Sequence, residues 1–268
     1  MSLLANFHTH STFCDGQNTP EEIVLAAIDS GFSSLGFSGH GYTPYDLRYC
    51  MKDTPGYIAE IRHLQKKYAD RLQIYLGVEE DSYAPLDRTS FDYIIGSSHY
   101  FCMEGAYYPV DSGLSYFQQC LALVDGDPVR LAEAYYAPFC RYISTRKPDV
   151  VGHFDLLTKF DEQNNDFLLS NAAYLDIADK YMYEAAQNEV LFEVNTGAIS
   201  RGYRHDPYPH ERLLHILKKC GRGVVLSSDS HAADTLAFGF EEAKVLLRAV
   251  GFDSVYVLYD HQWKKESI

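Results

Sequence analysis

Long apolar runs, paired cysteine motifs and positive charge are all scarce in this chain of 268 residues. No stretch of about 18 apolar residues occurs, so we expect no membrane-spanning segment. The first residues lack a basic segment followed by an apolar one, so we expect no secretory signal. The six cysteines are scattered and form no C-x-x-C pair, which is typical of reduced thiols in a cytoplasmic protein.

Acidic residues outnumber basic residues by 37 to 23, which gives a formal net charge of -14. A negative excess of this kind repels polyanions, so we expect no long nucleic-acid partner. A local group of metals or arginines can still attract a small anion. The apolar fraction of 46% is enough for a large core at this length. The composition therefore predicts a globular protein and leaves its oligomeric state open.

Short apolar segments alternate with segments of helical period along most of the chain. Such alternation predicts a parallel sheet with right-handed crossovers. The predicted strands are 3–7, 34–38, 73–78, 93–97, 150–152, 190–195, 223–227 and 254–259. The predicted helices are 20–31, 55–68, 168–187, 209–220 and 239–249.

Residues 102–148 interrupt this alternation. Their pattern predicts two helices, at about 114–124 and 127–145, and no strand. We interpret 102–148 as a helical insertion that packs over one end of the sheet, within a single domain of residues 1–268.

Side chains that can bind a metal follow six of the predicted strands near their carboxyl ends. His8 and His10 alone would be weak evidence, because two polar residues at a strand end need not bind anything. In a closed parallel barrel, however, all strand ends of this kind meet at one face. The set therefore predicts one shared pocket. Its strand-end members are His8, His10, His40, Glu79, His99, His153, Asp229 and His231, and Asp15 follows the first strand in a turn at Gly16.

Nine ligands are too many for one zinc ion, which prefers four. Nitrogen and oxygen ligands without thiolate suit two or three divalent ions such as Zn, Fe or Mn. Glu79 is the natural bridge between ions, because imidazole bridges poorly. Clustered ions activate water and stabilise an anionic transition state, so the expected chemistry is hydrolysis, most naturally of a phosphoester.

The ordered set of motifs resembles the polymerase and histidinol phosphatase (PHP) family. The resemblance runs from residue 8 to residue 231. The stretches FHTHSTFCDG and LGFSGHGYTP are most similar to the branch of the family that hydrolyses L-histidinol phosphate. The motifs are His8-Thr9-His10, Asp15, Gly39-His40, Gly77-Val78-Glu79, Ser98-His99, Gly152-His153 and Asp229-Ser230-His231.

The resemblance implies a distorted (β/α)7, TIM-like barrel with a trinuclear metal centre and a role in histidine biosynthesis. Family spacing favours Glu79 as the ligand, whereas its position at the strand end fits Glu80 equally well. The implied ligands are His8, His10, Glu79 and Asp229 for the first ion, Glu79, His99 and His153 for the second, and Asp15, His40 and His231 for the third.

A phosphate dianion also needs cationic donors, and arginine suits it best. Arg201 matches a phosphate-contacting arginine of the family, and Arg204 lies in the same loop. Lys159, six residues beyond His153, is a further candidate.

Other contacts are expected from the loops around the pocket. Tyr42, in a tyrosine-rich loop, and His205 are candidate substrate contacts. Asp229 or His231 could protonate the departing alkoxide, while Arg201 absorbs the developing charge.

Three alternatives stay open at this stage. One is a PHP phosphoesterase that acts on a nucleotide, an oligonucleotide or phosphotyrosine. The second is an amidohydrolase, which also uses His-x-His on a first barrel strand, although those enzymes commonly bridge their metals with a lysine and no lysine follows a strand here. The third is a metal-binding module without catalytic activity.

Overall fold

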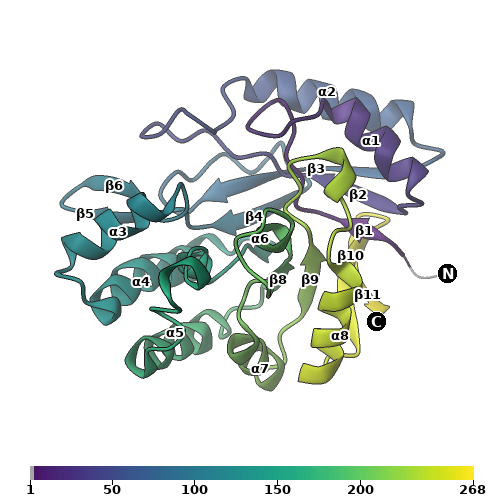
Figure 1. Cartoon of the computed structure of the whole chain (residues 1–268). Coiled ribbons are helices and arrows are strands. Elements are labelled where there is room, and N and C mark those ends of the chain that lie inside the picture. Colours follow the sequence, from purple (N-terminus) through teal and green to yellow (C-terminus); the bar gives the residue numbers. More distant parts are fainter. Residues whose placement is uncertain (1–2) are drawn as a thin grey trace.

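A computed structural model describes residues 3–268 of the chain and contains a seven-stranded, all-parallel sheet (Figure 1). The order of the strands in the sheet follows the order of the chain, and helices connect all of them except β3 and β4, which a loop joins. The strands, in sheet order, are β1 (Ala5–Asn6), β2 (Ser34–Phe37), β3 (Gln73–Asp81), β4 (Tyr93–Ser97), β7 (Val150–Val151), β8 (Leu191–Asn195) and β9 (Val224–Ser227).

The two edge strands of this sheet, β1 and β9, approach each other and nearly close a barrel. The closing contact is a parallel bridge between Thr9 and Ser230, just beyond the ends of both strands. His10 N donates to Ser230 O at 2.8 Å, and Ser230 N donates to His8 O at 3.1 Å. The prediction of a distorted seven-stranded, TIM-like barrel is confirmed. The closure also brings the first and last predicted ligand motifs side by side.

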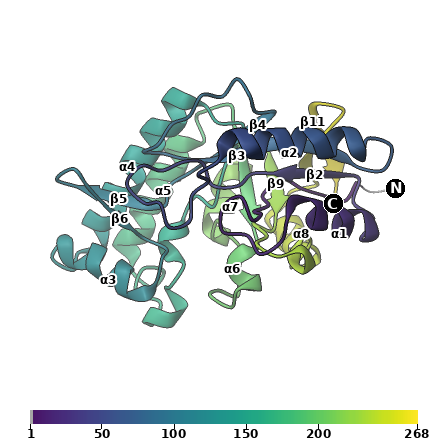
Figure 2. The ribbon, with the colours of Figure 1, turned by 90° about the horizontal axis from the view of Figure 1, so that it is seen from above.

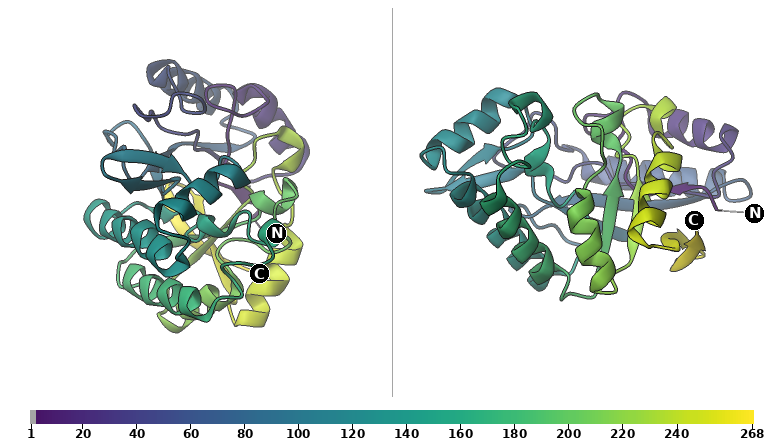
Figure 3. Two further views of the ribbon diagram at one scale, coloured as in Figure 1. Left: turned by 60° about the vertical axis from the view of Figure 1, so that its left-hand side comes forward. Right: turned by 60° about the horizontal axis from the view of Figure 1, so that its bottom comes forward.

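The helices lie outside the strands (Figures 2 and 3). Local sequence explains where they begin. Thr19 and Glu22 form a capping box before α1, and Pro residues occupy the first turns of α1, α2 and α4. The helices around the barrel are α1 (Pro20–Asp29), α2 (Thr54–Lys67), α4 (Pro128–Arg146), α5 (Ala172–Ala185), α7 (Glu211–Lys219) and α8 (Phe240–Val250). The remaining helical elements are α3 (Leu114–Leu123), α6 (Gly197–Ser200), η1 (Leu156–Thr158), η2 (Glu162–Asn164) and η3 (Ala233–Thr235).

The barrel interior is filled by side chains rather than left as a channel. Tyr93, which is 1% exposed, crosses it and donates from its hydroxyl to Phe7 O at 2.6 Å. A side chain at Gly36, on β2, or at Gly77, on β3, would collide with the Tyr93 side chain. The glycines on β2 and β3 therefore make room for the large residue of β4, as small and large residues alternate in barrel cores.

The prediction of no strand within 102–148 is wrong. A hairpin, β5 (Tyr100–Met103) with β6 (Ala106–Pro109), forms a separate two-stranded sheet before α3 and α4. Glu104 and Gly105, the two turn residues, both have positive φ angles, of 52° and 81°. Paired positive φ angles are the geometry of the tight hairpin turn, whose twist matches that of the strands. The two predicted helices of this segment are present.

The predicted last strand exists but lies outside the barrel sheet. β10 (Ser254–Tyr259) pairs antiparallel with β11 (Gln262–Ser267), a strand that the sequence did not reveal. Gln73, the first residue of β3, donates to Asp260 in the turn of this hairpin at 2.9 Å. The hairpin therefore lies at the amino ends of the strands, opposite the predicted ligands.

Helix α5 begins at Ala172 instead of 168. Asn171 accepts a hydrogen bond from Tyr174 N and caps the helix there. The preceding amides of Leu168 and Leu169 donate to the Asp161 carboxylate, which holds them outside the helix. Within residues 3–268, none of the helices is long and apolar enough to cross a membrane.

Candidate metal centre

All nine predicted ligands converge at the carboxyl ends of the barrel strands. Their side chains form four overlapping groups, and within each group the nitrogen and oxygen atoms that could bind an ion lie within 4.8 Å of one another. Histidines and carboxylates are shared between groups, as expected for neighbouring ions. The groups are His8, His10 and Asp229; His8, Glu79 and His153; His40, Glu79 and His99; and His10, Asp15, His40 and His231.

The deepest part of the centre is formed by His8, His10, Glu79 and Asp229. His8 Nε2 lies 3.3 Å from Glu79 Oε2, and His10 Nε2 lies 3.1 Å from Asp229 Oδ1. Although charged neighbours lie close to them, His8 Nε2, His10 Nε2 and Glu79 Oε2 are buried and form no hydrogen bond of suitable geometry with any of residues 3–268. Buried polar atoms are normally paired, and unpaired ones are costly. A divalent ion would satisfy all three, so these residues fit a bound metal.

Glu79 faces several histidines at once. Its Oε1 lies 2.9 Å from His153 Nε2 and 3.3 Å from His99 Nε2. Its Oε2 lies 2.8 Å from His40 Nδ1. Since the two oxygens face different imidazoles, this carboxylate can bridge two ions. The contact with His40 links Glu79 to a residue that the family resemblance assigns to the third ion.

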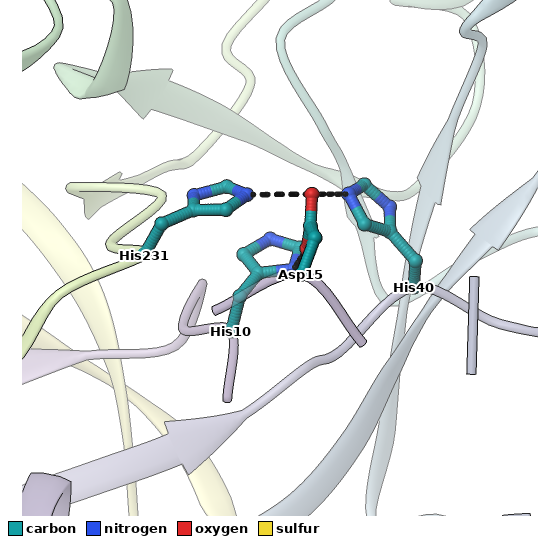
Figure 4. A group of neighbouring side chains, drawn as sticks. All are labelled: His10, Asp15, His40 and His231. Carbon is teal, nitrogen blue, oxygen red and sulfur yellow. Dashed lines mark ion pairs between the residues drawn. The ribbon is translucent and has the colours of Figure 1, made fainter. Parts of the chain in front are cut away.

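Asp15 lies between His40 and His231, with His10 beside them (Figure 4). Its Oδ2 is 3.6 Å from His40 Nε2 and 3.3 Å from His231 Nε2, and its Oδ1 is 3.6 Å from His10 Nδ1. The Asp15 side chain is 33% exposed, so this part of the centre is the most open. His10 thus presents Nε2 to Asp229 in the deepest part of the centre and Nδ1 to Asp15, whereas the family resemblance implies that it binds the first ion alone.

Two carboxylates behind the centre orient its histidines. Glu193 Oε1 lies 2.6 Å from His8 Nδ1, and Asp81 Oδ2 lies 3.1 Å from His99 Nδ1. When Nδ1 donates to a carboxylate, Nε2 keeps its lone pair for a metal. Neither Glu193 nor Asp81 is among the residues predicted from the sequence. The sequence does contain a pattern that could have revealed Asp81. Side chains alternate along a strand, so Asp81, two residues beyond Glu79, faces the same side of β3.

Burial and charge oppose each other in this centre. Burial alone would lower the pKa of His8, but the carboxylates of Glu193, Glu79 and Asp229 outweigh it and raise that pKa well above its usual value. Burial alone would raise the pKa of Glu79, but His8, His40 and His99 lower it well below its usual range. The carboxylates thus remain ionised, which is the state that binds metal ions.

Glu80 points away from the centre. Arg146 donates to its Oε2 at 2.8 Å, and the Tyr142 hydroxyl donates to its Oε1 at 2.7 Å. Leu86 N also donates to Oε2, at 2.6 Å. Successive side chains of a strand face opposite sides, so Glu79 turns to the histidines while Glu80 turns to helix α4.

A cavity of about 330 Å³ opens beside the centre, and its walls include Asp15, His40 and His99. Lys159 also lines it, and Lys159 Nζ donates to Asp111 O at 2.8 Å. Arg201 lies next to the centre, where it donates to Asp229 Oδ2 at 2.9 Å and to Asp229 O at 2.8 Å.

The other three candidate contacts lie elsewhere and do not line this cavity in the described part of the chain. Arg204 is 4% exposed and donates to Thr158 Oγ1 at 2.6 Å, so its charge is held inside the protein. His205 is exposed, with Glu162 as its partner, and the Tyr42 side chain is exposed on its loop.

A family model for the PHP domain matches residues 6–197, which is most of the chain. The chain belongs to the PHP family. The matched region spans the ligands from His8 to His153, and the fold brings Asp229 and His231 to them.

Two known proteins align with nearly the whole chain. It is 30% identical to a probable histidinol-phosphatase from Deinococcus radiodurans, over 94% of this chain and 95% of that protein. It is 26% identical to a probable histidinol-phosphatase from Schizosaccharomyces pombe, over 94% of this chain and 88% of that protein.

The PHP barrel also matches a solved structure, a histidinol phosphate phosphatase from Lactococcus lactis, complexed with zinc, L-histidinol and phosphate. The TM-score is 0.70 at 21% identity, over 98% of this chain and 99% of that one. This likeness supports the barrel fold described above.

Proposed function

We propose that this chain is a metal-dependent phosphatase that hydrolyses L-histidinol phosphate to L-histidinol and phosphate in histidine biosynthesis. The observation that carries the proposal is the group of unpaired, buried ligand atoms around Glu79. The names of the relatives and the zinc, histidinol and phosphate bound by the Lactococcus lactis protein support the choice of reaction and substrate. The cytoplasmic location expected from the sequence stays a prediction.

In this proposal the nine ligands hold two or three ions of Zn, Fe or Mn. Divalent ions bound in such a cluster supply an activated water and neutralise the charge on the phosphate. Glu193 and Asp81 hold His8 and His99 with Nε2 facing inward. These two carboxylates therefore fix the orientation of the two imidazoles before a substrate binds.

Arg201 is the proposed partner of both the centre and the substrate. Its contacts with Asp229 hold that ligand in place. Within residues 3–268, these contacts leave its Nε–H available for a phosphate oxygen. Burial alone would lower the pKa of Arg201, but Asp229 raises it, so the guanidinium stays charged. A charged arginine beside the reacting phosphate stabilises the charge of the transition state.

Proton delivery is assigned to Asp229 or His231. Both lie at the end of β9, next to Arg201, and His231 Nδ1 lies 3.0 Å from Asp229 O. The His231 side chain is 22% exposed, so it has access to solvent protons. His231 could protonate the departing alkoxide of the substrate, whereas the ionised Asp229 could orient a water molecule that donates the proton. Lys159 is the second proposed cation for the phosphate, because it lines the cavity beside the centre.

The test is metal analysis of the purified protein together with a panel of phosphomonoesters. We expect two to three divalent ions per chain and a preference for L-histidinol phosphate over nucleotides and phosphotyrosine. A preference for a nucleotide would contradict the proposed substrate but not the metal chemistry. Bound metal without hydrolysis of any phosphoester would contradict the proposed reaction.

A further inference from the structure

The cavity beside the metal centre contains one ion pair whose role the proposed function leaves unexplained. Two carboxylates line this cavity, Asp15 and Asp111. Asp15 belongs to the metal centre, whereas Asp111 follows the β5–β6 hairpin and lies outside every candidate ligand group in residues 3–268. Asp111 is therefore a carboxylate of the cavity without an assigned function.

Asp111 is held firmly next to the centre. Val110 N, directly before it, donates to the backbone oxygen of His99 at 3.0 Å. Lys159 Nζ donates to Asp111 O at 2.8 Å and to its Oδ2 at 3.3 Å. The hairpin thus fixes the position of Asp111 relative to a candidate metal ligand.

Part of the Asp111 carboxylate is open to the cavity. Its side chain is 22% exposed. Its Oδ1 has no hydrogen-bond partner in the described part of the chain, and the contact of Oδ2 with Lys159 is long. An ordinary aspartate beside a lysine is ionised at neutral pH. Asp111 can therefore accept a charge-assisted hydrogen bond from a ligand while its contacts with Lys159 remain in place.

The other cation of the cavity is already engaged. Arg48 Nε donates to Asp46 Oδ1 at 2.8 Å, and the Arg48 side chain is 59% exposed at the rim. The inner wall therefore presents a lysine and a carboxylate side by side. A ligand that matches this pair carries an anionic group and, next to it, a cationic one.

We propose that Asp111 selects phosphomonoesters that carry an ammonium group near the ester, by pairing with that ammonium. This inference rests on the proposed function, since L-histidinol phosphate belongs to this class: two carbon atoms separate its ammonium nitrogen from the ester oxygen. Phosphate and Lys159, then ammonium and Asp111, form two complementary ion pairs. Asp111 acts on specificity and takes no part in breaking the ester bond.

The test compares matched esters with and without the ammonium group. L-histidinol phosphate is paired with its analogue that lacks the amine, and ethanolamine phosphate is paired with ethyl phosphate. The quantity measured is the ratio of kcat/KM between the amine ester and its amine-free partner. For Asp111→Asn we expect this ratio to fall by about 10- to 100-fold, since a charge-assisted hydrogen bond is lost. Asp111→Glu should restore much of the ratio.

The matched control is Glu104→Gln. Glu104 lies at the exposed turn of the same hairpin, so this change removes one negative charge without touching the cavity. The ratio should stay at its wild-type value. A fall in Glu104→Gln as large as that in Asp111→Asn would overturn the proposal, because net charge alone would then explain the effect.

Two further outcomes decide the matter. If Asp111→Asn lowers kcat/KM equally for both esters of a pair, Asp111 acts only by positioning Lys159 and the proposal is wrong. If the wild-type enzyme hydrolyses other phosphomonoesters better than L-histidinol phosphate, the proposed function fails. The ethanolamine phosphate and ethyl phosphate pair then still decides the role of Asp111: a fall in the ratio supports it, and an unchanged ratio overturns it.

Discussion

Two adjacent glutamates on β3 are equally buried but have opposite surroundings. Glu79 and Glu80 are each 1% exposed. Glu80 has an arginine, a tyrosine hydroxyl and a backbone amide as partners, so its charge is compensated within the protein. Glu79 faces histidines, and one of its oxygens lacks a hydrogen-bond partner within residues 3–268. A buried carboxylate with complete partners stabilises a fold, whereas one with incomplete partners is prepared for a ligand.

Of the changes that test this difference between the two glutamates, Glu79→Gln should have the largest effect on activity and metal content. The amide keeps the size of the side chain but loses the charge that can bridge two ions. We expect kcat/KM for the preferred phosphomonoester to fall on the order of 10³-fold or more, with loss of bound metal. Elemental analysis and steady-state kinetics measure both. Full metal content with normal turnover would show that Glu79 is not a ligand.

A second experiment separates the deep part of the centre from its open part. His8→Ala should remove or displace the ion held by the deep group, and Asp15→Ala the ion next to His40 and His231, with the remaining ions retained. Anomalous diffraction from crystals of each variant locates the ions that remain. Loss of the same ion in both variants would contradict the division into two parts.

The pH dependence of metal binding follows from the raised pKa values of His8, His40 and His99. In each case burial lowers the pKa, but neighbouring carboxylates raise it above 6.5 on balance. These histidines keep their protons to a higher pH in the metal-free protein, and an ion must displace those protons. Apparent metal affinity should therefore rise with pH through and above 6.5, by about tenfold per unit for each proton displaced. Calorimetric titrations in buffers of different ionisation enthalpy measure the number of protons released when the metal binds. A metal affinity that does not change with pH would contradict the raised pKa values.

The smallest effect on activity is expected from Glu80→Gln, which is also the control for Glu79→Gln. The variant should keep its metal and its turnover per folded molecule. Its free energy of unfolding should fall by about 1–2 kcal/mol, because Arg146 loses its charged partner but is 33% exposed and can be solvated. Urea unfolding measures this change. Loss of metal in this variant would remove the distinction between the two glutamates.

The alternation of strands and helices predicted a parallel sheet from the sequence alone, and the resemblance to the PHP family implied that this sheet forms a barrel. The sequence also singled out nine candidate ligands, because the ends of parallel strands must meet at one face. It missed the β5–β6 hairpin, since the Glu104-Gly105 turn is short and the strands are only four residues each. That hairpin is the element that places Asp111 in the cavity.

Tertiary structure alone decided which residues face one another. Glu79 and Glu80 are indistinguishable by strand position, and only the register of β3 against its neighbours turns one inward. Glu193 and Asp81 became recognisable as partners of His8 and His99 only through contacts between distant segments. Arg204 and Lys159 both looked like candidate cations, yet one is buried against Thr158 and the other lines the cavity. Periodicity in a sequence determines which elements form, whereas the direction of each side chain depends on how those elements pack.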